Sequence, residues 1–287
     1  MKYGLPYQGS KSIIAKDIIA ALPPADYLYD LFAGGCAVTH CALESGKYKK
    51  VFVNDLNTAP QLFLNAVAGK YRNEKRWISR EQFHAEKMFD PFVRWLWSFG
   101  NNGDGYLFGS AIEPIKKAAH EYLFENGYDG TKEQRLELIR QFKADENIKS
   151  RFELEQLERL ERLQQLERLE RLQQLERLQQ LERRLIVSWR DYRKIKIKLC
   201  SVVYCDIPYG HKKTTKEKYY GVDFDCDEFY RWARSAEFPV YFSSVFAPKK
   251  FKVVWKKETQ CKMINKNSRG KKVIVERLFW NGVTICK

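Results

Sequence analysis

Ser201-Val-Val-Tyr-Cys-Asp206-Ile-Pro-Tyr209 is an apolar, β-branched run that ends at an acidic residue, a proline and an aromatic residue. A short unbroken apolar run indicates a strand that is buried on both faces, as in a parallel sheet. Polar groups at the carboxyl end of such a strand lie where open α/β folds bind their ligands. The stretch therefore predicts an α/β sheet with Asp206 at its ligand-binding edge. An ordinary Asp-x-Pro turn is the alternative interpretation.

A second apolar strand, at 27–31, leads into the small residues Ala33, Gly34 and Gly35 and a predicted helix. Glycine lets a ligand approach the backbone closely, and the start of a helix offers free N–H groups. A further strand at 50–54 precedes Asp55. This arrangement is typical of a mononucleotide-binding βαβ half, in which the second acid binds ribose hydroxyls. The full dinucleotide glycine fingerprint is absent, which disfavours a nicotinamide or flavin cofactor.

The order of the motifs resembles that of the Dam-like (D12 class, alpha-type) DNA adenine-N6 methyltransferases found in phages and restriction-modification systems. The matching segments are Tyr7-Gln-Gly-Ser-Lys11, Asp30-Leu-Phe-Ala-Gly-Gly35, a long middle region, Asp206-Ile-Pro-Tyr209 and Glu276-Arg-Leu-Phe-Trp-Asn281. The resemblance implies a Rossmann-like S-adenosylmethionine-dependent methyltransferase fold. It also implies methyl transfer from S-adenosylmethionine to N6 of an adenine flipped out of duplex DNA.

The resemblance also implies roles for individual residues. The cofactor-binding residues would be Tyr7, Lys11, Asp30, Phe32, Ala33, Gly34, Gly35, Asp55, Asp191, Tyr192 and Asp206. The catalytic residues would be Asp206, Ile207, Pro208 and Tyr209. Asp206 and the Ile207 carbonyl would accept hydrogen bonds from the target amine, and Tyr209 would stack on the base. No metal is expected, because a methyl group on a cationic sulfur needs mainly alignment.

Ile207 is a departure from the family pattern, which usually has proline at this position. Isoleucine supplies the same main-chain carbonyl but does not lock φ. Asp206 favours adenine as the target, because the cytosine-N4 class usually has serine there.

Composition and length predict a globular protein with one α/β domain and a smaller second region, since the chain has 287 residues of which 44% are hydrophobic. Neither an 18-residue apolar run nor a signal-peptide pattern is present, so we expect a cytoplasmic protein without a membrane partner. The seven cysteines form no Cys-x-x-Cys pair and are predicted to be reduced core residues.

Positive charge is concentrated near the carboxyl end. Of the net charge of +15, +13 lies in residues 185–287, which contain 23 Lys+Arg and 10 Asp+Glu. A basic region beside the predicted catalytic strand favours double-stranded DNA as the partner over a merely solubilising surface.

The predicted organisation has three parts. Residues 1–65 would form the cofactor-binding part of the α/β domain, 66–185 a mostly helical target-recognition insertion, and 186–287 the catalytic part. The sheet would resume at 191–197 and continue with strands ending at Asp206 and near 239–244, 251–256 and 273–280. Trp95 and Trp97 are predicted to pack in a core. The loop at 99–109, rich in glycine and asparagine, is either an ordinary connection or a segment near DNA.

A leucine repeat lies inside the insertion. Leucine occupies every third position from Leu154 to Leu181, within Leu-Glu-Arg and Leu-Gln-Gln units, and residues 151–184 are predicted to form one long helix. At 100° per residue the leucines wind around an α-helix and cannot form a straight coiled-coil seam. We therefore expect a helical spacer and a monomer, not an obligate oligomer.

Two other functions stay open at this point. One is methylation of adenine in RNA, which uses a similar acid-x-Pro-aromatic strand end. The other is a non-enzymatic assembly role for the repeat helix on an inactive methyltransferase domain.

Overall fold

The computed structural model describes residues 2–145, 163–208, 216–219, 222–260 and 273–285. The chain forms two compact units. The first contains Met1–Tyr3, Lys11–Pro60 and Arg183–Lys287, and the second contains Gly4–Ser10 and Gln61–Glu182.

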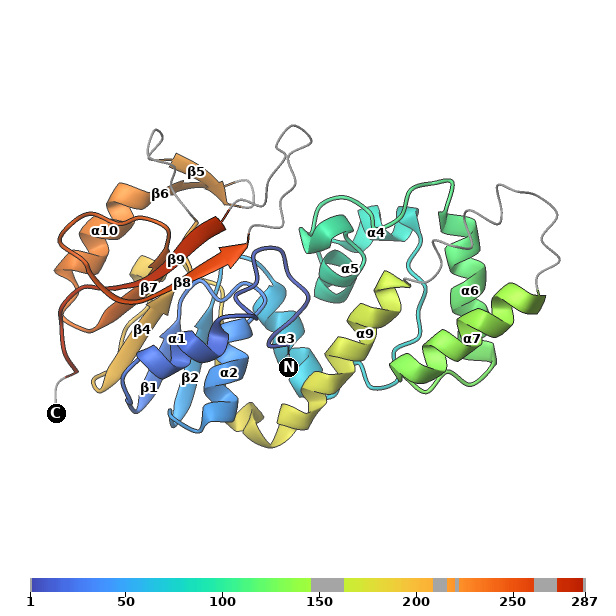
Figure 1. The fold of residues 1–287 in the computed structure, drawn as a ribbon, viewed down its shortest axis with the longest axis horizontal. Coiled ribbons are helices and arrows are strands. Elements are labelled where there is room, and N and C mark those ends of the chain that lie inside the picture. Colours follow the sequence, from blue (N-terminus) through green and yellow to red (C-terminus); the bar gives the residue numbers. More distant parts are fainter. Residues whose placement is uncertain (1, 146–162, 209–215, 220–221, 261–272, 286–287) are drawn as a thin grey trace. The chain divides into compact units, whose positions relative to one another are not determined.

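A seven-stranded sheet is the centre of the first unit (Figure 1), with the strand order β3-β2-β1-β4-β7-β9-β8. The strands β3, β2, β1, β4 and β7 are parallel, whereas β9 pairs antiparallel with both β7 and β8. This mixed α/β architecture is compatible with a Rossmann-like methyltransferase fold. The bounds are β1 Tyr27–Asp30, β2 Lys50–Asn54, β3 Leu185–Ser188, β4 Ser201–Cys205, β7 Val240–Ser244, β8 Lys252–Gln260 and β9 Val273–Trp280. The strands β5 (Lys216–Tyr219) and β6 (Val222–Asp225) pair antiparallel in a separate two-stranded sheet.

The helices of this unit have identifiable end signals. The helix α2 (Ala37–Ser45) ends at Gly46, whose φ of 67° suits a residue without Cβ. The helix α10 (Cys226–Ser235) begins where the Asp225 side chain accepts a hydrogen bond from the Glu228 N–H. The remaining helices are α1 (Ala15–Ala21) and α3 (Ala59–Val67), the latter continuing into the second unit.

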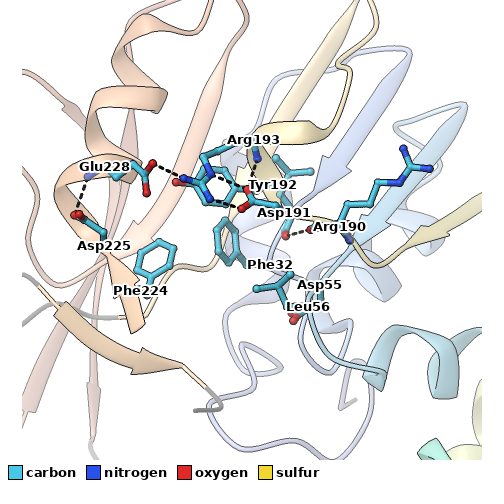
Figure 2. A pocket seen from close by; sticks show the side chains of 12 residues that line it. Phe32, Asp55, Leu56, Arg190, Asp191, Tyr192, Arg193, Phe224, Asp225 and Glu228 are labelled. Carbon is cyan, nitrogen blue, oxygen red and sulfur yellow. Dashed lines mark hydrogen bonds and ion pairs between the residues drawn. The ribbon is translucent and has the colours of Figure 1, made fainter. Parts of the chain in front are cut away.

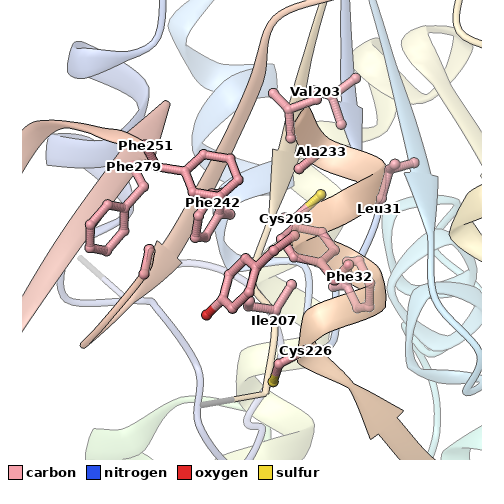
Figure 3. Packing of buried hydrophobic residues seen from close by; sticks show 14 of the residues in the cluster. Leu31, Phe32, Val203, Cys205, Ile207, Cys226, Ala233, Phe242, Phe251 and Phe279 are labelled. Carbon is pink, nitrogen blue, oxygen red and sulfur yellow. The ribbon is translucent and has the colours of Figure 1, made fainter. Parts of the chain in front are cut away.

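Alternation along the strands assigns each side chain to one face of the sheet. Tyr29, Val203, Cys205 and Phe242 pack with Phe229 of α10 in a buried apolar cluster (Figure 3). The intervening residues therefore face the opposite side. Asp30 confirms this, because its carboxylate accepts a hydrogen bond from Thr39 of α2 at 2.7 Å.

The strands predicted at 27–31, 50–54, 239–244, 251–256 and 273–280 are present with small shifts of their ends. The prediction that the sheet resumes at 191–197 is wrong. The strand beside β2 is β3, and residues Tyr192–Lys194 form a 3₁₀ turn instead. The turn forms because the Asp191 side chain accepts a hydrogen bond from the Arg193 N–H at 2.9 Å.

The second unit is built from helices around an aromatic core. The capping box of Ser79 and Gln82 begins α4 (Arg80–Glu86), and Asp90 caps α5 (Pro91–Leu96). The helices α6 (Glu113–Glu125) and α7 (Lys132–Asp145) follow a short 3₁₀ turn at Phe99–Asn101. Trp95 and Trp97 are 0% and 2% exposed, which confirms their predicted core packing.

The leucine repeat does not form one continuous α-helix. Its first residues, 151–162, lie outside the described residues, Gln164–Gln174 form α9, and Leu175–Arg184 form a 3₁₀ helix, η3. A repeat of three matches the 3.0 residues per turn of a 3₁₀ helix, so Leu175 and Leu178 lie on one line and both are buried. In α9 the same repeat winds around the axis, and Gln165 and Arg168 are buried together with the leucines.

Candidate active site

Lys11 and Asp206 form an ion pair at the carboxyl end of β4. Lys11 Nζ lies 2.8 Å from Asp206 Oδ1 and 3.7 Å from Glu276 Oε1. The same Asp206 oxygen accepts a hydrogen bond of 3.4 Å from the Ser243 hydroxyl, which also contacts the Tyr204 hydroxyl. The second Asp206 oxygen, Oδ2, has no hydrogen-bond partner among the described residues, and the side chain is 21% exposed.

Strand alternation explains why these groups meet. Tyr204 and Asp206 are two residues apart in β4 and its extension, and Cys205 between them packs toward α10. In the neighbouring strand Phe242 packs toward α10, so Ser243 points to the same face as Asp206. Because Ser243 pairs with Leu278, Glu276 lies on that face as well.

Burial and neighbouring charges set the ionisation of this cluster. Burial raises the pKa of Asp206, and the nearby Lys11 only partly offsets this effect. Burial lowers the pKa of Lys11, but the charges of Asp206 and Glu276 outweigh it, and the pKa is raised overall. Asp30, on the same face of β1, has a pKa raised to about 7, mainly by burial. The cluster therefore places the Lys11 ammonium beside the carboxylate oxygens of Asp206 and Glu276.

The glycine turn after β1 is closed by Asp55. Gly34 has a φ of 47° and donates its N–H to Asp55 Oδ2 at 2.8 Å. The other Asp55 oxygen accepts hydrogen bonds from the N–H and side-chain amide of Asn57, at 3.1 and 2.7 Å. Asp55 thus fixes the conformation of the glycine turn and links it to the start of the segment after β2.

A pocket adjoins this turn in the first unit (Figure 2), with an empty volume of ≈ 610 Å³. Three rings contribute to its wall, since Phe32 lies 5.1 Å from Tyr192 and 5.5 Å from Phe224 between ring centroids. The lining residues are Leu31, Phe32, Asn54, Asp55, Leu56, Arg190, Asp191, Tyr192, Arg193, Phe224, Asp225 and Glu228.

A hydrogen-bonded chain of charges crosses one side of the pocket. Asp191 accepts hydrogen bonds from Arg193, which also pairs with Glu228 (Figure 2). The hydrogen bond from the Arg193 side chain is the main reason that the pKa of Asp191 is lowered. The carboxylate is therefore ionised and held by Arg193.

Asn54 is a site residue that the sequence analysis missed. Its amide nitrogen donates to the carbonyls of Leu31 and Arg190, at 3.2 and 2.8 Å, and its oxygen accepts from Ser188 and the Arg190 N–H, at 2.8 and 2.9 Å. These bonds join the carboxyl ends of β1, β2 and β3. A polar residue directly before Asp55, at the end of an apolar strand, was the available signal.

The predicted site residues are only partly brought together. Phe32, Asp55, Asp191 and Tyr192 line the pocket, and Gly34 bonds to Asp55. Lys11, Asp30 and Asp206 lie on the opposite face of the sheet from α10.

The other predicted residues lie elsewhere or outside the described residues. Tyr7 belongs to the second unit, with its ring 5.1 Å from that of Trp95. The Ile207 side chain is 2% exposed and packs in the apolar cluster (Figure 3). Pro208 accepts a weak hydrogen bond from the Cys226 thiol, and Tyr209 lies outside the described residues.

Two features are absent from the ranges that the structure describes. In these ranges, no helix is both long and apolar enough to cross a bilayer. No group of three or more His, Cys, Asp or Glu side chains that could hold a metal ion occurs in the same ranges.

Comparison with known proteins gives one family match. The model of the D12 class N6 adenine-specific DNA methyltransferases matches residues 7–108, which include the glycine turn, Lys11 and Asp55. No curated protein sequence matches the chain.

Proposed function

We infer that this chain, a D12 class N6 adenine-specific DNA methyltransferase, binds S-adenosylmethionine in the aromatic pocket and holds the target amine with Asp206. The family establishes site-specific adenine methylation and implies the methyl donor. The placement of donor and target is our proposal.

The pocket residues fit the parts of this cofactor. Phe32, Tyr192 and Phe224 offer flat apolar surfaces for an adenine ring. Asp55 has its carboxylate at the pocket and can accept hydrogen bonds from ribose hydroxyls in addition to those from Gly34 and Asn57. The turn at Ala33, Gly34 and Gly35 would pass beneath the cofactor. When bound, the cofactor supplies a methyl group on a cationic sulfur.

The Oδ2 atom of Asp206 is the single observation that carries the catalytic proposal. Lys11 and Ser243 both bind Oδ1, which fixes the carboxylate and leaves Oδ2 as an acceptor. An aromatic amine is a poor nucleophile because its lone pair is delocalised into the ring. Hydrogen bonds from the amine to Oδ2 and to the Ile207 carbonyl would turn that lone pair toward the methyl group. The Asp206 carboxylate would also be placed to accept the proton that the amine must lose when it is methylated.

The buried side chain of Ile207 accounts for the departure from the family pattern. Proline fixes the backbone covalently, whereas Ile207 is 2% exposed and anchored in the apolar cluster. Packing therefore supplies the restraint that the pyrrolidine ring gives in other members. We propose that Pro208 stiffens the same turn and that Tyr209 stacks on the flipped base.

We propose that the substrate is double-stranded DNA and that the protein binds it as a monomer. We assign cofactor binding to residues 1–65, target recognition to 66–185 and the catalytic strand to 186–287. The excess of Lys+Arg over Asp+Glu in residues 185–287 supports contact with phosphates.

The test is to measure methyl transfer to duplex DNA and cofactor binding separately. Asp206→Asn and Asp206→Ala should abolish transfer, with unchanged far-UV circular dichroism. Tyr192→Ala should weaken cofactor binding in calorimetry, whereas Tyr192→Phe should retain most of it. Substantial transfer by the Asp206 variants would overturn the catalytic assignment. Asp17→Asn, which removes a half-exposed carboxylate from α1, is the control.

A further inference from the structure

Glu276 is a buried acidic residue to which neither the family match nor the proposed mechanism assigns a role. It lies on β9, and its Oε1 atom is 3.7 Å from Lys11 Nζ. The side chains of Lys11 and Glu276 are each 10% exposed, compared with 21% for Asp206. The ammonium of Lys11 thus lies between two carboxylates from different strands.

The charges within this trio do not balance. One ammonium group faces two carboxylates, and all three are largely removed from water, where charges interact strongly. Burial raises the pKa of Asp206, and the positive charge of Lys11 lowers it. The negative charge of Glu276 raises the same pKa and so opposes the effect of Lys11. Glu276 therefore reduces the extent to which the Lys11 ammonium stabilises the negative charge of Asp206.

We propose that Glu276 is a positioning residue which, by sharing the Lys11 ammonium, keeps the Asp206 carboxylate a strong acceptor for the target amine. Without Glu276, the full charge of Lys11 would neutralise Asp206, and Oδ2 would accept a hydrogen bond less strongly. This role depends on the proposed function of Asp206. Glu276 itself needs no contact with substrate.

Three other groups act on Asp206 or on its hydrogen-bond partner, and a substitution at Glu276 does not alter their chemistry. Ser243 approaches from β7, the Tyr204 hydroxyl contacts Ser243, and Asp30 interacts electrostatically from β1. Because these groups are common to the wild type and the variant, a difference in the titration of Asp206 reports on Glu276 and Lys11.

The test compares Glu276→Gln with Glu258→Gln. Both variants remove one negative charge and keep the side-chain shape, but Glu258 is exposed on the neighbouring strand β8. The titration of Asp206 is followed by ¹³C NMR of labelled carboxyl groups without cofactor, with Asp206→Asn to assign the signal. In Glu276→Gln the pKa of Asp206 should fall by about one unit, as expected for the loss of a nearby like charge. In Glu258→Gln it should not move.

Kinetics give a second readout. For Glu276→Gln we expect kcat to fall about tenfold with little change in the KM for DNA, and the acid limb of the pH profile to move to lower pH. In Glu276→Asp, which keeps the negative charge, the pKa of Asp206 should stay closer to its wild-type value.

Two results separate the possible failures. In the first, Asp206→Asn abolishes methyl transfer, but Glu276→Gln leaves both the pKa of Asp206 and kcat at their wild-type values. That result refutes the role of Glu276 and leaves the proposed function standing. If Asp206→Asn remains active, the proposed function itself fails.

Discussion

Lys11 Nζ lies 2.8 Å from Asp206 Oδ1, although the two residues are far apart in the sequence. The pair joins the first segment that carries the family resemblance, which ends at Lys11, to the later segment that begins at Asp206. Lys11 and Ser243 both contact the same Asp206 oxygen, Oδ1. The arrangement depends on β4 lying beside β1 in the centre of the sheet.

Gly34→Ala should reduce both stability and cofactor affinity. The φ of 47° at Gly34 disfavours any residue with Cβ, at a cost of about 1–2 kcal/mol. The hydrogen bond to Asp55 would be distorted, and the turn would no longer fit the cofactor. Chemical denaturation and calorimetry check both effects.

Gly46→Ala is the matched control for this substitution. Gly46 has a φ of 67°, and a Cβ there would meet no atom within 4 Å. This variant should lose similar stability without losing cofactor affinity. An equal loss of affinity in both variants would argue against a specific role for the glycine turn.

Asn54→Ala should open the pocket wall. Asn54 is 3% exposed and bonds to backbone groups of Leu31 and Arg190, so truncation leaves several buried groups unsatisfied, at a cost of about 2–4 kcal/mol. Cofactor affinity should fall with stability, because Arg190 to Arg193 line the pocket.

Asn281→Ala provides the comparison. Asn281 also bridges backbone groups, of Val240, Ala233 and Phe238, but it is not among the pocket residues. We expect it to lower the unfolding free energy without weakening cofactor binding. Equal binding by both variants would show that Asn54 only stabilises the fold.

Asp30 should make the stability of the first unit dependent on pH. Its pKa rises from 3.8 to about 7 on folding, so the folded state binds the proton more tightly. The associated stability is fully present below about pH 4 and is lost as the pH rises through 7, by at most about 4 kcal/mol. Asp30→Asn removes this titration and can still accept the bond from Thr39. Urea unfolding at pH 5 and pH 8 should therefore show a smaller decrease for the variant than for the wild type. Identical decreases would contradict the assignment.

Arg168→Ala should destabilise the second unit, unlike the equivalent change at Arg177. Both arginines occupy the same place in Leu-Glu-Arg units, but Arg168 is buried and donates to the carbonyls of Leu96 and Ser98, whereas Arg177 is exposed. Loss of the buried guanidinium should cost about 2–4 kcal/mol, and loss of the exposed one under 1 kcal/mol. Thermal unfolding measures the difference. Similar losses would show that the register of the repeat differs from the one described.

Local patterns were sufficient to predict most of the sheet. The strands at 27–31 and 50–54 and the strand ending at Asp206 were predicted because each is a short apolar run followed by turn residues, and such runs depend mainly on their own composition. The strand at 185–188 was missed because it directly follows the leucine repeat, whose helical composition extends to Arg184. The turn after Asp191 was missed because a side-chain hydrogen bond overrode the β-branched pattern around Ile195 and Ile197.

The sequence by itself determined most of the sheet-forming strands, the acidic residues that follow several of them and the resemblance to the D12 class methyltransferases, because these are properties of short contiguous segments. Only the tertiary structure decided which acidic residue forms an ion pair with Lys11. The same holds for the hydrogen bonds by which Asn54 joins three strand ends, and for the burial of one arginine of the repeat while another is exposed. Identical or similar local sequences have the same propensities, and only packing against residues distant in the chain distinguishes them.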